Sequence, residues 1–206
     1  MDLILLIIAL LIVVTIHEFS HAAVANFFGD PTAKHSGRLT LNPLKHLDPI
    51  GVLMMFIAHI GWGKPVPVNP RYFKNPKREE ALTALAGPAS NLLLAVILAI
   101  PVKYFAEIIP SQITYFLAMM MDVSIYLFAF NMLPFPPLDG SKFVGIFVPK
   151  KFEFAYKRYL QSGVTYFVLF LLFDQLFLAR VLGFSILYQF MGIIYTFVKS
   201  IIFLGT

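Results

Sequence analysis

The chain has 206 residues, of which 59% are hydrophobic and 13% are charged, and its formal net charge is +5. A soluble domain of this size could not bury so much apolar surface, so the composition excludes a soluble globular protein and indicates a polytopic membrane protein. The absence of cysteine excludes disulfides, cysteine-ligated zinc and cysteine nucleophiles. The positive charge does not call for a nucleic-acid partner, because membrane proteins concentrate lysine and arginine in cytoplasmic loops.

The first apolar run, residues 3–25, is long enough to span a membrane and contains His17-Glu18-Phe19-Ser20-His21 near its end. Two histidines four positions apart lie on one face of a helix, so both imidazoles can bind one zinc ion. The glutamate between them can act as general base toward a water beside that ion. The alternative is a coincidental polar end on a signal anchor. A carboxylate on a membrane helix costs roughly 2.5–3.5 kcal/mol, which favours the functional interpretation.

Two short segments follow before the second span. Residues 50–62 are apolar but shorter than the roughly 20 residues of a span, so they favour a re-entrant segment over a spanning helix. Residues 65–70 alternate proline and valine. In a strand, the prolines would block one edge, while the N–H groups of Val66 and Val68 could pair on the other. A one-sided strand and a plain loop explain this pattern equally well.

The second and third spans are predicted at residues 81–105 and 113–133. Small or polar residues lie on one face of the second span, which allows another helix to approach closely. These residues are Ala84, Gly87, Pro88, Asn91 and Ala95. The third span ends in Asn131, followed by three prolines and Asp139-Gly140. Prolines break the helical hydrogen bonds here, so this end should face protein or water and not lipid.

Two apolar segments, about residues 162–178 and 184–203, complete the chain.

Lysine and arginine are concentrated in three stretches, with three in residues 26–50, five in 63–80 and five in 140–160. All three can be cytoplasmic only if residues 50–62 enter the membrane and return. We therefore expect an all-α membrane protein with about five transmembrane helices and one re-entrant segment. Its N-terminus would be outside and its C-terminus cytoplasmic.

The predicted topology limits the choice of a third metal ligand. Catalytic zinc usually has three protein ligands and one open position. No glutamate occurs between Glu18 and Glu79, so the third ligand is sought among Asp30, Asp48 and Asp139. Asp139 fits best, because the topology brings it to the same side and depth of the membrane as the two histidines.

At the level of the whole chain, the sequence resembles the site-2 protease family of intramembrane zinc metalloproteases, in its compact form without PDZ or CBS modules. The resemblance covers most of the chain to about residue 142. It rests on His17–His21, Leu41-Asn42-Pro43 with Asp48-Pro49, residues 61–70, Gly87-Pro88-Ala89-Ser90-Asn91, and Asn131 to Gly140. It implies one Zn²⁺ bound by His17, His21 and Asp139, catalysis by Glu18, and a site lined by Asn91 and Asn131. It also implies a small membrane-associated β element between the first and second spans.

These features predict an enzyme of the cell membrane that hydrolyses peptide bonds within or near transmembrane segments of single-span proteins. The substrate helix would unwind locally and pair with Val66 and Val68 by strand addition. Residues 1–206 would form one domain, with a catalytic core at about 1–142 and a C-terminal helix pair at about 160–204. The alternative is a non-catalytic zinc-binding membrane protein, either a transporter or a binder of membrane helices. A homo-oligomer or a regulatory membrane partner remains open.

Overall fold

The computed structural model describes residues 2–51 and 63–204, and all of its regular elements are helices. The α-helices are α1 (Asp2–Phe27), α2 (Thr32–His35), α4 (Pro76–Tyr104), α5 (Ser111–Asn131), α6 (Asp139–Val144), α7 (Glu153–Phe173) and α8 (Ile186–Ile202). The short 3-10 helices are η1 (Pro43–Lys45), η2 (Pro70–Tyr72), η3 (Gly145–Phe147) and η4 (Lys150–Phe152), and η5 (Asp174–Leu182) is a π-helix.

Four helical stretches are long and apolar enough to cross a membrane, namely α1, α4, α5 and the run from η4 through η5. The fifth apolar helix, α8, is shorter than a full span. The chain is therefore a multi-pass all-α membrane protein in its described part, as the composition predicts. The predicted re-entrant segment at residues 50–62 lies almost wholly outside the described residues.

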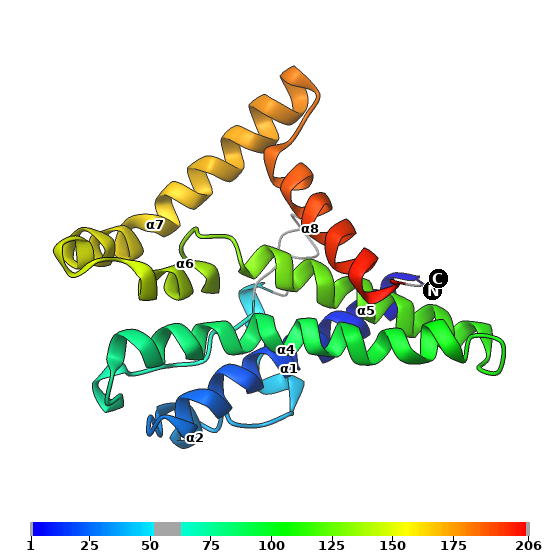
Figure 1. Ribbon diagram of the computed structural model, residues 1–206, viewed down its shortest axis with the longest axis horizontal. Coiled ribbons are helices and arrows are strands. Elements are labelled where there is room, and N and C mark those ends of the chain that lie inside the picture. The colour runs from blue at the N-terminus through cyan, green and yellow to red at the C-terminus, as the bar shows by residue number, and fades with distance from the viewer. Residues whose placement is uncertain (1, 52–62, 205–206) are drawn as a thin grey trace.

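The helices α1, α4 and α5 form the central bundle, with their long axes roughly aligned (Figure 1). The predicted small-residue face of α4 is buried in full along its length. Ala95 on this face has no exposed surface, and neither has Ala9 on α1; both belong to one apolar core together with Met121 and Ile125 of α5. Small side chains at these positions allow the helix backbones to approach closely.

The end of α5 is broken by prolines, and the chain turns back into α6. Gly140 lies against this break, because a Cβ atom on it would be 2.4 Å from the Met132 carbonyl oxygen and 2.5 Å from that of Leu133. The start of α6 thus packs against the carbonyls of Met132 and Leu133. Because α6 starts directly beside the end of α5, its first residue, Asp139, points back into the bundle toward α1.

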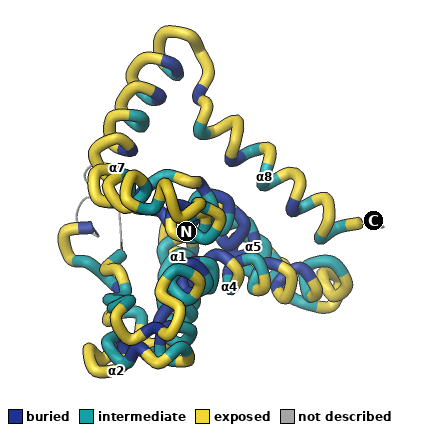
Figure 2. The backbone as a smooth tube through the Cα atoms, turned by 60° about the vertical axis from the view of Figure 1, so that its left-hand side comes forward, coloured by how far each residue is buried: buried dark blue, intermediate teal, exposed yellow. Residues whose placement is uncertain are grey.

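The last two helices, α7 and α8, form an open V that projects from the bundle (Figure 1). Most of their residues are exposed, in contrast to the inner faces of the bundle (Figure 2). The tip of the V is held by Asp174, which is fully buried and accepts hydrogen bonds from the Ser185 hydroxyl at 2.5 Å and the Ile186 N–H at 2.7 Å. Asp174 therefore has a structural role in joining α7 to α8 through these two hydrogen bonds.

The structure corrects the predicted position of the C-terminus. Lys103, at the end of α4, donates a hydrogen bond to the carbonyl oxygen of Leu204 at 3.2 Å. The start of α1 and the end of α8 consequently lie at the same end of the bundle (Figure 1), and not on opposite sides. The reason is that α8 runs antiparallel to α5, with Lys199 bound to Asp122, and so leads away from the end where α5 and α6 meet.

The predicted β element is also absent from the described residues. The only ladder contact there is an isolated antiparallel bridge between Leu47 and Gly63. Residues 64–69 form irregular chain without a strand partner. A strand requires a neighbouring backbone edge, and the nearest acceptor for the Val66 N–H is instead the side chain of Glu18, at 3.1 Å.

Candidate metal centre

In the part of the chain that the structure describes, one group of side chains is arranged to hold a metal ion. The Nε2 atoms of His17 and His21 lie 3.0 Å apart, and the Asp139 Oδ2 atom lies 3.1 Å from each of them. Both histidines come from α1, one helical turn apart, and Asp139 is the first residue of α6. The structure thus brings together the three predicted ligands, although Asp139 is at least 118 positions away from both histidines in the sequence.

The orientation of His21 is set by α4. Its Nδ1 atom lies 2.7 Å from the carbonyl oxygen of Thr83. A carbonyl can only accept, so Nδ1 carries the hydrogen and the lone pair of Nε2 points toward His17 and Asp139. Metal-binding histidines are commonly oriented in this way by a carbonyl on the far side of the ring.

Asn91 of α4 contacts the far side of the other ring, with its amide nitrogen 2.9 Å from His17 Nδ1. Its carbonyl oxygen is buried and has no hydrogen-bond partner in the described residues. The two ends of an amide have nearly the same shape, and a turned amide would accept a hydrogen from Nδ1. This orientation satisfies both groups and leaves the Nε2 lone pair of His17 directed at the cluster.

Gly87 gives α4 room beside the cluster. A Cβ atom at this position would lie 2.3 Å from His21 Nε2 and 2.6 Å from His17 Nε2. Any side chain here would therefore collide with the two nitrogen atoms that face the centre. The sequence indicated close helix packing at Gly87, but it carried no signal that the packing partner was the histidine pair.

The donor set fits a zinc ion. Ligand atoms about 2.0–2.2 Å from a tetrahedral Zn²⁺ would lie about 3.3–3.6 Å from one another, slightly farther apart than the three atoms seen here. Two imidazole lone pairs and one carboxylate face a common point, an arrangement that a cation stabilises.

Glu18 lies on α1 between the two histidines, and its Oε2 atom accepts the Val66 N–H. The guanidinium of Arg38 is also close to this carboxylate. Burial lowers the pKa of Arg38, and the negative charge of Glu18 opposes that shift. Arg38 is 5% exposed and donates to the Lys64 carbonyl oxygen. Sequence reasoning missed Arg38, since no spacing relates it to the metal motif.

The remaining predicted site residues lie apart from the cluster. The Asn131 amide donates to the Leu127 carbonyl oxygen of its own helix at 3.0 Å, and no hydrogen bond joins it to His17, His21 or Asp139. Within the described residues the Val68 N–H has no hydrogen-bond partner. Of the four residues predicted to contact substrate, Asn91 contacts a candidate ligand and Val66 contacts Glu18.

Comparison with known proteins points to one family. A model of peptidase family M50 matches residues 100–173, a range that includes Asp139 but not the histidine motif. The chain is 45% identical to YwhC of Bacillus subtilis over 151 residues, which cover 70% of this chain and 69% of YwhC. It is 35% identical to Rip2 of Mycolicibacterium smegmatis over 133 residues, covering 61% of this chain and 50% of Rip2. Both relatives are named as zinc metalloproteases. No solved structure matches the chain.

A membrane-length helix carries two histidines, and the short helix α6 places an aspartate beside them. Together with these relatives, this arrangement defines a zinc metalloprotease with membrane helices. The chain belongs to peptidase family M50, the site-2 protease family of zinc metalloproteases. The family favours the enzymatic interpretation of the sequence over a non-catalytic zinc binder. The resemblance found in the sequence motifs is thereby confirmed.

Proposed function

We propose that this protein is an intramembrane zinc protease, which hydrolyses peptide bonds within or near transmembrane segments of single-span membrane proteins. The observation that carries the proposal is the convergence of His17, His21 and Asp139 at one end of a bundle of apolar helices. A hydrolytic centre among membrane helices can reach a peptide bond of the substrate that lies in or beside the membrane. The proposed cofactor is one Zn²⁺ held by these three side chains.

Glu18 is proposed to move the protons of the reaction. A zinc ion bound at this site would supply a Lewis acid and a more acidic water. Glu18 takes a proton from the attacking water, whose oxygen forms a bond to the carbonyl carbon of the substrate. Protonated Glu18 then gives that proton to the amide nitrogen, and the C–N bond breaks. A carboxylic acid and an amine are formed, and the second proton of the water passes from the acid to the amine, which leaves a carboxylate and an ammonium group.

Substrate binding is proposed to use backbone groups. A carbonyl within an intact helix is hydrogen-bonded and shielded, so the substrate must unwind near the cut, and residues such as Gly, Pro or Asn would favour unwinding there. The unwound strand would pair with the N–H groups of Val66 and Val68 by strand addition. Asn131 remains a candidate for contact with the substrate. Asn91 is better placed to orient His17, which it already contacts.

The proposed location is the cell membrane, with the metal centre toward the cytoplasm and the N-terminus outside. The basic residues at 26–50, 63–80 and 140–160 support this orientation. The proposed partners are the lipid bilayer and the membrane substrate. This proposal is compatible with a homo-oligomer or with a regulatory membrane protein bound to the enzyme. The chain would act as one metalloprotease domain.

The test uses the Glu18→Gln variant, reconstituted in lipid vesicles with single-span membrane proteins. We expect cleavage to fall by about 10²–10⁴-fold, the usual contribution of a general acid–base residue, while the protein keeps one zinc per chain. The matched control is Glu107→Gln, an exposed residue between α4 and α5, which should cleave as the wild type does. Chelation should abolish cleavage and added Zn²⁺ should restore it. Normal cleavage by Glu18→Gln would refute the proposed role.

A further inference from the structure

A backbone amide already occupies the carboxylate that the proposed function makes the general base. The Val66 N–H donates to Glu18 Oε2 at 3.1 Å. Val66 lies between Pro65 and Pro67, which have no N–H groups, so it carries the only amide hydrogen of that tripeptide. The contact joins two residues 48 positions apart, on α1 and on the chain that leads to α4.

The segment that carries this amide is held in place by other contacts. Before Val66, the Lys64 N–H donates to the His46 carbonyl oxygen at 2.9 Å, and Arg38 donates to the Lys64 carbonyl oxygen. After it, the Asn69 N–H donates to Asp30 Oδ2 at 2.7 Å, and Asp30 is fully buried. The Val66–Glu18 hydrogen bond can therefore break while both ends of the segment stay attached.

The same amide is needed for two purposes. In the proposed function it donates to a carbonyl of the unwound substrate strand, whereas in the free protein it donates to Glu18. A single N–H makes one strong hydrogen bond at a time, because the strength falls steeply when the angle departs from linearity. The substrate strand and the Glu18 carboxylate therefore compete for the Val66 amide.

We infer that the Val66 amide is a substrate-operated switch on Glu18. In the free protein it holds the Glu18 carboxylate against residues 65–67. An extended peptide takes over the Val66 N–H, and Glu18 turns to the attacking water. The inference rests on the proposed function and adds a specificity rule: a peptide too short to reach Val66 leaves Glu18 held and is cut slowly.

Proline substitutions provide the first test. Val66→Pro removes the N–H, and its conformation is suitable because a residue before proline already favours the extended region that proline adopts. We expect it to cut a 12-residue peptide about tenfold more slowly, and a four-residue peptide about tenfold faster, than the wild type, the factor that corresponds to about one hydrogen bond. The two substrates thus change in opposite directions.

Val68→Pro is the matched control, because the Val68 N–H has no partner within the described residues. It should slow the long peptide without accelerating the short one. If Val66→Pro leaves the short peptide unchanged or slows it, Glu18 is not restrained by this amide and the switch is refuted.

Hydrogen exchange provides a readout that needs neither substrate nor cleavage. The fragment of residues 63–70 has few exchangeable amides, because three of its residues are proline. In the free wild type we expect Val66 and Asn69 to exchange slowly. Glu18→Ala should accelerate exchange at Val66 alone, since Asp30 still holds Asn69. Unchanged exchange at Val66 would overturn the switch even if Val66→Pro failed to fold. A wild type that cuts neither peptide would instead count against the proposed function.

Discussion

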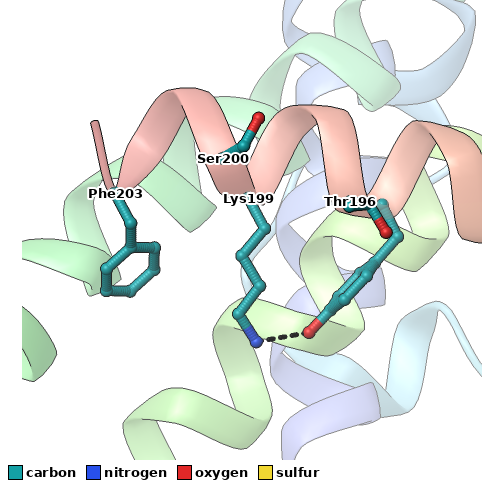
Figure 3. A pocket seen from close by; sticks show the side chains of 5 residues that line it. Thr196, Lys199, Ser200 and Phe203 are labelled. Atoms are coloured by element: carbon teal, nitrogen blue, oxygen red, sulfur yellow. Dashed lines mark hydrogen bonds between the residues drawn. The ribbon is translucent and has the colours of Figure 1, made fainter. Parts of the chain in front are cut away.

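The metal centre and a second polar cluster, formed by Asp122, Tyr195 and Lys199, both place a carboxylate where helices of the protein meet. At the second cluster, the Tyr195 hydroxyl donates to Asp122 Oδ1 at 2.7 Å and the Lys199 amino group donates to the same oxygen at 3.0 Å. Lys199 is also directed at the Tyr195 hydroxyl (Figure 3). This carboxylate has a cation and a donor of its own, supplied by α8.

In the described part of the chain, the carboxylate of the metal centre has no lysine, arginine or hydroxyl partner of this kind. Asp139 faces two imidazoles whose far sides are occupied by Thr83 and Asn91, so that the lone pairs, and not hydrogens, are directed at the centre. One cluster is complete within the protein, and the other is complete only with a cation. Charged residues in a membrane helix can form either a structural contact or a reactive site. Whether the protein itself supplies a cation for the carboxylate distinguishes the two more clearly than the presence of the charge.

The largest expected effect comes from filling the space beside the imidazoles. In Gly87→Ala, the new Cβ would overlap His21 Nε2, and the ring cannot shift freely because Thr83 holds its other side. We expect zinc affinity to fall by more than about 100-fold, beyond the loss typical of one orienting contact, and cleavage to disappear. Zinc per chain after dialysis measures this.

Gly192→Ala on α8 is the matched control, because nothing lies within 4 Å of its Cβ position. It should retain zinc and cleavage. If Gly87→Ala also retained its zinc, the centre would not have the tight geometry described for it.

The sequence predicted the parts of the fold that depend on local pattern. The spans predicted at residues 3–25, 81–105 and 113–133 correspond to α1, α4 and α5, because long apolar runs and proline signals determine helices without tertiary information. Counting crossings selected Asp139 among three aspartates, and this is the aspartate that the structure places beside His17 and His21. The metal cluster could thus be anticipated from one chain.

Features that depend on a distant partner could not be predicted. The prolines around Val66 indicated an unpaired edge, but only the packing against α1 makes Glu18 its acceptor. The position of Leu204 depends on α8 binding α5, and charge counting could not reveal this, because Lys199 is paired with Asp122 between these two helices. Arg38 comes close to Glu18 through a loop that has no periodic pattern.

An intermediate effect is expected from the side chain behind His17. Asn91→Ala removes the group that orients the ring, and it should weaken zinc binding by about 10–100-fold, the usual range for such contacts. Asn91→Asp keeps an oxygen that can accept the Nδ1 hydrogen, so it should bind zinc nearly as the wild type does. Competition with a chromophoric chelator measures both affinities.

Asn131→Ala separates the two asparagines that were predicted to line the site. Among the described residues, the Asn131 amide donates its hydrogen bond to the Leu127 carbonyl of its own helix and not to a candidate ligand, so its loss should leave zinc affinity unchanged. For the Asn91→Asp variant, weak zinc binding would mean that His17 Nδ1 needs a hydrogen-bond donor. The turned orientation of the Asn91 amide would then be incorrect.

The smallest effect is expected at the cluster that is complete without a metal. Asp122→Asn and Lys199→Met each break the ion pair between α5 and α8, and the double variant removes it entirely. Hydrogen bonds between membrane helices contribute about 0.6 kcal/mol on average and at most about 1.7 kcal/mol, so a double-mutant cycle should give a coupling energy in that range. Unfolding in detergent micelles measures this coupling energy.

The three variants should keep one zinc per chain, because Asp122 shares no contact with His17, His21 or Asp139 in the described structure. Loss of zinc in Asp122→Asn would show that α8 supports the metal centre, and the two clusters would then have to be treated as one coupled unit.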